Sequence, residues 1–168
     1  MLKGDSAILV TARQVTAALA EAGLSAAVIG GVAVGLHGHL RSTMDVNVWT
    51  DEPLDEVALV LRAMGCAWSS AKREFRLAGV PIHLVTPVQA GPLRTAPKTI
   101  DDIRVAALPD LLNMKLRSGL RSVVRAQDLA DVIGLIRVKR LTSAFAARLD
   151  RDLRGEFRKL VKAVRSEA

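Results

Sequence analysis

The segment from Val28 to Trp49 carries the residues whose types and spacing suggest chemistry. Polar and apolar residues alternate from Met44 to Trp49, which predicts a strand with Asp45 and Asn47 on the same face. A carboxylate and an amide oxygen two residues apart are suitable ligands for a divalent cation that accompanies a triphosphate. The spacing therefore indicates a cation and phosphate site beside this strand.

Gly30 and Gly31 support this interpretation from the preceding element. They stand between a short apolar run, Ala26–Ile29, and a helix, where backbone N–H groups can converge on a phosphate. Two glycines are also what a plain tight turn needs, and for the pair taken alone this simpler interpretation is favoured. Arg41 and Thr43 add a cation and a hydroxyl immediately before the strand.

The rest of the chain predicts the elements that must position these residues. Helical spacing of apolar residues, with caps and terminal glycines or prolines, predicts helices at 5–22, 32–37, 53–64, 109–119, 126–140 and 148–164. Apolar or alternating runs predict strands at 26–29, 44–49, 74–77, 80–85 and 102–106. The strands around Ala78 and Gly79 form an expected hairpin in which Glu74 faces His83. Residues 86–99 are rich in Pro, Gly and Thr and predict a loop.

Several motifs in the same order resemble the nucleotidyltransferase superfamily, whose fold is that of DNA polymerase β. The sequence follows G-G-x-A-x-x-x-x-G from Gly30 to Gly38, and R-x-T-x-D-x-D from Arg41 up to its last position. Residues 108–116 resemble the family's helix with a lysine near its end, and residues 127–132 resemble the acidic segment that follows it. Within the superfamily, the chain is similar to the minimal bacterial members grouped with the AbiEii and AbiGii toxins.

The resemblance covers roughly residues 5–140 and implies a polymerase β-like α+β fold with a small mixed sheet flanked by helices. It implies a nucleotidyltransferase core at 1–106 and a helical C-terminal portion, packed on that core, at 107–168. Catalytic roles fall on Asp45, Asn47, His83 and Lys115, and contacts with a nucleoside triphosphate fall on Gly30, Gly31, Arg41, Thr43 and Asp128. Asp45 and Asn47 would hold Mg²⁺ or Mn²⁺.

Lys115 and Asp128 also have purely structural interpretations. By the resemblance Lys115 reaches the triphosphate, whereas its long aliphatic stem would equally allow it to extend from an apolar helix to solvent. Asp128 and Asp131 are three residues apart and share a helical face. They would support Lys115 or the substrate, or simply stabilise the start of their helix through its dipole.

Two positions depart from the family pattern. Asn47 stands where the second metal-binding carboxylate is expected, and His83 stands where the third is expected on the later hairpin strand. An amide keeps an oxygen ligand but loses the negative charge, so Mg²⁺ would bind weakly, and imidazole is a poor ligand for it. His83 would instead act as a base, with Glu74 orienting it or supplying the missing carboxylate. A partly exposed strand residue that is simply paired with Glu74 explains His83 equally well. A softer metal such as Zn²⁺ or Mn²⁺ on His37, His39, His83 and Asp45 is a less favoured alternative.

Composition limits the partners. The formal charge is +7, which favours a polyanion such as RNA or a nucleoside triphosphate, although a solvated basic surface explains the charge equally well. Aromatic residues make up 3% of the chain, which predicts no base-stacking platform, so any RNA, such as tRNA, would be held through its phosphates. No apolar run is long enough for a membrane span or signal peptide, and the one cysteine, Cys66, is expected to be a buried thiol in a reduced cytoplasm.

Two functions remain open at this point. One is an enzyme that transfers a nucleotide to RNA or to a protein hydroxyl, as toxin-type relatives do. The other is a catalytically inactive nucleotidyltransferase-fold module that binds nucleotide or a partner, such as a cognate toxin or antitoxin. Transfer to an aminoglycoside is a weaker option, because a cationic acceptor needs acidic walls and this chain is basic.

Overall fold

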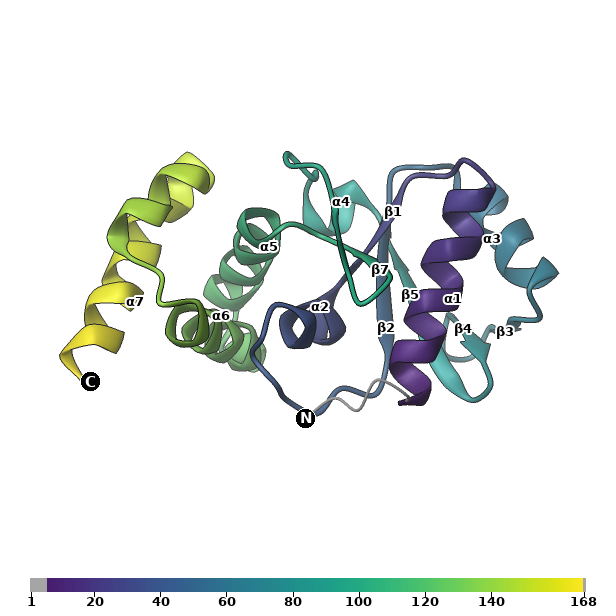
Figure 1. The fold of residues 1–168 in the computed structure, drawn as a ribbon, viewed down its shortest axis with the longest axis horizontal. Coiled ribbons are helices and arrows are strands. Elements are labelled where there is room, and N and C mark those ends of the chain that lie inside the picture. The colour runs from purple at the N-terminus through teal and green to yellow at the C-terminus, as the bar shows by residue number, and fades with distance from the viewer. Residues whose placement is uncertain (1–5, 168) are drawn as a thin grey trace.

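The computed structural model describes residues 6–167 and is built on one seven-stranded mixed sheet (Figure 1). In the sheet the strands follow the order β3-β4-β5-β2-β1-β7-β6. They span Ala26–Ile29 (β1), Val46–Thr50 (β2), Ala67–Ser69 (β3), Glu74–Leu77 (β4), Val80–Val85 (β5), Lys98–Ile100 (β6) and Ile103–Val105 (β7). The central strand β2 runs antiparallel to β1 and parallel to β5.

Helices cover both faces of the sheet. Figure 1 shows α1 (Ala7–Glu21) and α3 (Leu54–Ala63) on one side, and α2 (Gly30–Leu36), α5 (Leu108–Arg121) and α6 (Ala126–Lys139) on the other. The C-terminal helix α7 (Arg154–Ser166) packs on α6 and lies farthest from the sheet. Shorter helical segments are α4 (Pro87–Ala90), η1 (Val123–Arg125), η2 (Ser143–Arg148) and η3 (Arg151–Leu153). The expected α+β architecture is confirmed.

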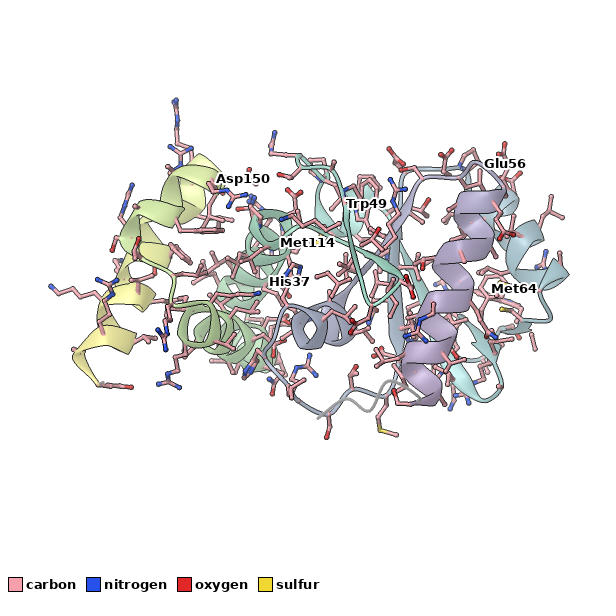
Figure 2. The ribbon with its side chains drawn as sticks, in the orientation of Figure 1. His37, Trp49, Glu56, Met64, Met114 and Asp150 are labelled. Atoms are coloured by element: carbon pink, nitrogen blue, oxygen red, sulfur yellow. The ribbon has the colours of Figure 1, made fainter. Side chains whose placement is uncertain are left out.

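The core is aliphatic, as the composition requires. All four residues of β1 are buried, which explains their continuous apolar run, because helices cover both faces of a central strand. His37 lies in the middle of the molecule, between α2 and the C-terminal helices (Figure 2). Its Nε2–H donates to the carbonyl oxygen of Ala106 at 2.8 Å, and burial lowers the pKa of this imidazole. Cys66 is buried as expected, and burial raises the pKa of its thiol.

The expected hairpin is confirmed, including its register. Leu77 pairs with Val80 and Phe75 with Ile82, so the turn is Ala78-Gly79. At the first helix, Ser6 accepts a hydrogen bond from the N–H of Leu9 and caps α1, while the predicted first residue of this helix, Asp5, lies outside the described residues.

Several predicted boundaries are wrong. The segment 86–99 is not all loop, because it contains α4 and the start of β6, and the short strand β3 has no alternating pattern long enough to reveal it. α5 passes through Gly119 instead of ending there. This glycine allows α6 to approach closely, because a Cβ at position 119 would lie 2.7 Å from Cγ of Leu129 on α6. The last helix, predicted from residue 148, begins only at Arg154, and the short 3₁₀ helices η2 and η3 precede it.

Candidate nucleotide-binding cleft

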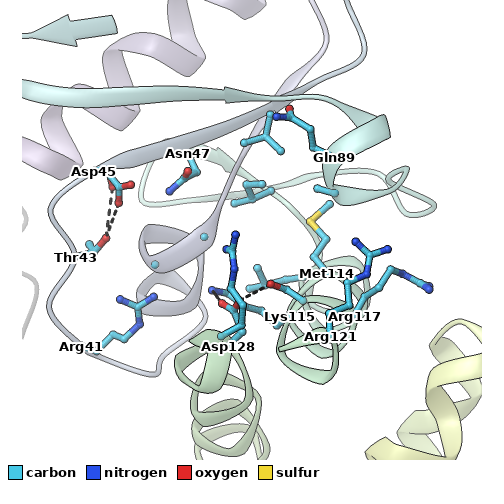
Figure 3. Close-up of a pocket in the computed structure, with 18 of the residues that line it drawn as sticks. Arg41, Thr43, Asp45, Asn47, Gln89, Met114, Lys115, Arg117, Arg121 and Asp128 are labelled. Carbon is cyan, nitrogen blue, oxygen red and sulfur yellow. Dashed lines mark hydrogen bonds and ion pairs between the residues drawn. The ribbon is translucent and has the colours of Figure 1, made fainter. Parts of the chain in front are cut away.

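A cleft of about 840 Å³ lies between the sheet and the helix α5 (Figure 3). One wall comes from the end of β1, the start of α2 and the segment leading into β2. The opposite wall comes from α5 and the start of α6. Eight of the nine predicted site residues line it: Gly30, Gly31, Arg41, Thr43, Asp45, Asn47, Lys115 and Asp128.

The sheet-side wall depends on the two glycines. Gly30 has φ +69°, and a Cβ there would lie 2.9 Å from Nδ2 of Asn47. A Cβ on Gly31 would lie 2.6 Å from Oγ1 of Thr43. Both glycines are therefore needed so that polar side chains of the next segment can approach the first turn of α2. That turn has no side-chain cap at Ile29, so its leading N–H groups lack a side-chain acceptor.

Asp45 stands just before β2, which begins two residues later than the alternating pattern suggested. Figure 3 shows Asp45 and Asn47 on the same wall, with Thr43 directed toward Asp45. The Thr43 hydroxyl lies 3.4 Å from the carboxylate oxygen Oδ1 of Asp45. The expectation that Asp45 and Asn47 share a face agrees with their common position in the cleft.

The helical wall holds a network of charged residues. Lys115 is buried, and its Nζ lies 2.7 Å from Asp128 and 2.9 Å from Asp131. Arg41 reaches the same Asp131 with two nitrogens, Nε at 2.7 Å and Nη2 at 3.1 Å. Lys115 does not extend into solvent, and the two carboxylates hold its ammonium group at the cleft. This network joins the segment before β2 to α5 and α6.

Asp131 is the centre of this network and has no exposed side-chain surface. Burial alone would raise its pKa, but hydrogen bonds from Arg41 and Lys115 outweigh burial and lower the pKa below its ordinary value. Gln127 donates a further hydrogen bond at 3.0 Å. Asp131 is thus an ionised carboxylate that fixes Arg41 and Lys115. Sequence patterns indicated only a supporting role for Asp131, because Asp131 and Arg41 are far apart along the chain and no local pattern reveals their contact.

Sequence reasoning missed the arginines of the helical wall. Arg117, Arg121 and Arg125 recur every four residues along α5 and η1 and all line the cleft. Arg117 is paired with Asp150 and Asp152, and hydrogen bonds from its nitrogens to Asp152 raise its pKa. Within residues 6–167, no carboxylate forms an ion pair with the other two arginines. Their spacing of four residues, which places them on one face of a helix, was the sequence signal that could have revealed this basic wall.

His83 lies at the edge of the cleft, not in it. Its partner across the parallel β2–β5 pair is Asn47. Its Nε2 lies 3.5 Å from Oδ2 of Asp45 and also 3.5 Å from Oε2 of Glu74, as the hairpin register suggested. Because ionised carboxylates only accept hydrogen bonds, Nε2 must carry a hydrogen to interact with either of them. Glu74 is buried and is also paired with Arg76.

The alternative metal site is wrong. Among residues 6–167, no three His, Cys, Asp or Glu side chains are arranged to hold a metal ion. His37 in particular is buried, and its Nε2 is hydrogen-bonded to the carbonyl oxygen of Ala106.

Comparisons with solved structures agree with this architecture. The chain superimposes on the antibiotic-resistance factor ANT(2″)-Ia, solved in complex with adenylyl-2″-tobramycin, with a TM-score of 0.60 and 12% identity, over 94% of this chain and 97% of that one. A protein from H. pylori assigned as a nucleotidyltransferase matches with a TM-score of 0.56 and 13% identity over 96% of both chains. An antigenic nucleotidyltransferase-like protein from Paracoccidioides brasiliensis gives 0.56 and 16%, over 76% of this chain and 74% of that one.

These likenesses establish the fold: the chain is a nucleotidyltransferase-fold protein of the polymerase β type. No family model matches the sequence, and no curated protein matches it in sequence. None of the helices within residues 6–167 combines the length and the apolar character that crossing a membrane requires.

Proposed function

We propose that the cleft binds a nucleoside triphosphate and that the protein transfers the nucleotide slowly to a hydroxyl acceptor. The observation that carries this proposal is that one wall of the cleft offers oxygen ligands for a cation and the opposite wall offers basic side chains for phosphates. Asp45 and Asn47 lie on the sheet side, and Figure 3 places Lys115, Arg117 and Arg121 on the helix side. Such a cleft suits a polyanion that also carries a divalent cation.

The phosphates fit the wall of basic residues and the first turn of α2. Arg121 and Arg125 are exposed and unpaired within residues 6–167, so an anion can bind them without displacing an internal carboxylate. Lys115 and Arg41 are already oriented by Asp131, which lowers the entropy that a ligand must remove on binding. The N–H groups at Gly30 and Gly31 would complete the phosphate contacts.

A divalent cation fits this cleft only when the substrate supplies most of its ligands. Asp45 and Asn47 would hold it, with one carboxylate and one amide oxygen from the protein. Mg²⁺ commonly keeps waters and phosphate oxygens alongside one or two carboxylates, so this donor set is compatible with weak binding. When bound, the ion would neutralise charge on the triphosphate.

Nucleotide transfer would take place where Asp45 meets His83. The acceptor oxygen forms a bond to the α-phosphorus, the bond from that phosphorus to the bridging oxygen breaks, and pyrophosphate leaves. The acceptor's proton passes to the Asp45–His83 pair, and Glu74 holds the imidazole from its other side. Loss of two carboxylates relative to the family pattern is the reason to expect a low rate.

The likeness to AbiEii-type toxins extends the proposal to the acceptor and the biological partner. It favours a hydroxyl of RNA, including tRNA, or of protein, and a cognate toxin or antitoxin. An aminoglycoside acceptor is disfavoured although ANT(2″)-Ia shares the fold. Five basic side chains line the cleft, against two acidic ones, and they would repel a polycation.

The second candidate is an inactive module that binds nucleotide without transferring it. The position of His83 favours this candidate, because its Nε2 faces two carboxylates and must release its hydrogen before it can accept a proton.

One assay separates the candidates. The protein is incubated with each α-labelled nucleoside triphosphate, Mg²⁺ or Mn²⁺, and either total tRNA, a protein extract or tobramycin. Label on an acceptor that disappears in Asp45→Ala establishes transfer. Absence of label from every acceptor, together with calorimetric binding of the triphosphates, establishes the inactive module. Absence of binding as well contradicts both candidates.

A further inference from the structure

A second groove, of about 630 Å³, lies beside the cleft at the C-terminal end of β5 and is lined by residues of α3, β3, β4 and β5. In Figure 1, α3, β3 and β4 gather at the end of the molecule opposite α7. The groove is lined by, among others, Arg62 and Arg73, the aromatic residues Trp68 and Phe75, and His83. The proposed binding of a triphosphate leaves this groove unused.

The groove and the cleft meet at the residues where transfer would occur. Both are lined by Val85 and Gln89. His83 lines the groove, and its Nε2 is 3.5 Å from Asp45, which lines the cleft. A molecule in the groove can therefore present a group to the Asp45–His83 pair while a triphosphate occupies the cleft.

Trp68 gives the groove an aromatic surface that the sequence did not predict. The indole packs against Phe75, its cross-strand partner, with ring centroids 4.9 Å apart, yet its residue remains 48% exposed. The composition led to the expectation of no base-stacking platform, and the exposed indole of Trp68 is a surface that this expectation did not consider. A low aromatic content limits how many platforms exist, but not whether one of them is placed at a site. An exposed indole is a sequence-tolerant surface for a nucleobase.

The charges of the groove suit a phosphate backbone. Arg62 and Arg73 are exposed, and neither forms an ion pair within residues 6–167. The Arg62 guanidinium lies 5.9 Å from the centroid of Phe75, so it stays next to the aromatic surface. Asp55 is the acidic residue among those that line the groove.

We infer that this groove binds the 3′ end of a single-stranded RNA as the nucleotide acceptor. The inference rests on the proposed transfer reaction and names its acceptor class. The terminal base stacks on Trp68, the adjoining phosphates contact Arg62 and Arg73, and the terminal hydroxyl points to the Asp45–His83 pair. A protein segment bearing a hydroxyl would need neither the exposed indole nor two unpaired arginines.

The test measures RNA binding separately from triphosphate binding. A single-stranded ten-nucleotide RNA, labelled with fluorescein at its 5′ end, is titrated with the protein and followed by fluorescence anisotropy. We expect Trp68→Leu to weaken binding about tenfold and Trp68→Phe, which keeps an aromatic face, to weaken it less than about threefold. Val138→Ala, at an equally exposed apolar side chain of α6, is the control and should leave binding unchanged.

A second variant guards against a local effect of Trp68 on the β3–β4 pair. Arg62→Gln combined with Arg73→Gln removes two phosphate contacts, so the slope of log affinity against log salt should fall by about 1.4. Equal affinity for all variants, or full displacement of the RNA by a nucleoside triphosphate, overturns the inference.

Transfer of label to a protein hydroxyl that is unaffected by Trp68→Leu also overturns it. The two proposals fail separately, because calorimetry with triphosphates reports on the cleft alone. Triphosphate binding without RNA binding refutes the groove inference and leaves the proposed function standing. RNA binding that depends on Trp68, without triphosphate binding, refutes the proposed function instead.

Discussion

Replacing Asp131 by Asn tests the network that holds the basic wall of the cleft. The substitution keeps the shape of the side chain and removes its charge. Asp131 is fully buried and faces Arg41 at 2.7 and 3.1 Å and Lys115 at 2.9 Å. Asp131→Asn therefore leaves two cations without their shared carboxylate. No cavity is created, so the effect reports on the lost charge and on the acceptor oxygen that the amide NH2 group replaces.

The expected cost is about 3 kcal/mol of unfolding free energy. Removing one partner of a buried ion pair costs about 3–5 kcal/mol. The lower end applies because Lys115 keeps Asp128 at 2.7 Å, and the side chain of Arg41 is 25% exposed and partly solvated. For a chain of this length, each kcal/mol lowers the melting temperature by about 2–4 °C, so the variant should melt roughly 6–12 °C lower.

The pH dependence gives an independent check. Because the folded pKa of Asp131 is lowered, its contribution to stability is fully present above its unfolded value of 3.8. That contribution is lost as the pH falls below 3.8 toward the folded pKa. The free energy of unfolding of the wild-type protein should therefore approach that of Asp131→Asn as the pH falls through this window.

Urea denaturation followed by circular dichroism, at pH 7 and at several values below pH 4, measures both effects. The control is Glu156→Gln, which breaks an exposed pair with Lys159 on α7 and should change stability by less than about 0.5 kcal/mol. A loss below 1 kcal/mol at pH 7 for Asp131→Asn, or a difference from wild type that does not shrink in acid, would refute the reasoning.

Three further predictions follow from local geometry. Gly31→Ala should cost about 1–3 kcal/mol and weaken triphosphate binding in calorimetry, because its Cβ would meet Thr43 at 2.6 Å. Gly155→Ala, where a Cβ on α7 meets nothing within 4 Å, should be neutral or stabilising by up to about 1 kcal/mol, and equal losses for both glycines would contradict the contact. Since the folded pKa of His37 is lowered, stability should fall as the pH drops below 6.5, and urea midpoints in His37→Leu should lack that fall. Burial and the raised pKa of Cys66 should make its thiol react with iodoacetamide far more slowly than in urea, which mass spectrometry measures.

The local part of the site was predictable from the sequence, whereas its long-range part was not. Gly30, Gly31, Thr43, Asp45 and Asn47 fall within one strand–helix–strand segment, and residue order and period-two alternation were enough to bring them together. The hairpin register was likewise recoverable, because a two-residue turn fixes which residues face each other.

The contact between Arg41 and Asp131 spans 90 residues and depends on how α6 packs against the sheet-side segment. No local pattern encodes such packing. The groove around Trp68 was missed for a related reason, since β3 has only three residues and its exposure depends on α3 and β4. The end of α5 was wrongly predicted at Gly119, because this glycine allows close packing against Leu129 and does not end the helix.

We propose above that the cleft binds a triphosphate with its cation at Asp45 and Asn47. Isothermal titration of each nucleoside triphosphate with Mg²⁺, into wild-type protein and into Asn47→Asp, tests it most directly. We expect measurable binding to wild type, and binding tightened by about tenfold in Asn47→Asp with Mg²⁺ but not with EDTA, because a second carboxylate faces the cation. Absence of heat for every triphosphate, or equal affinity of both proteins with and without Mg²⁺, would contradict it.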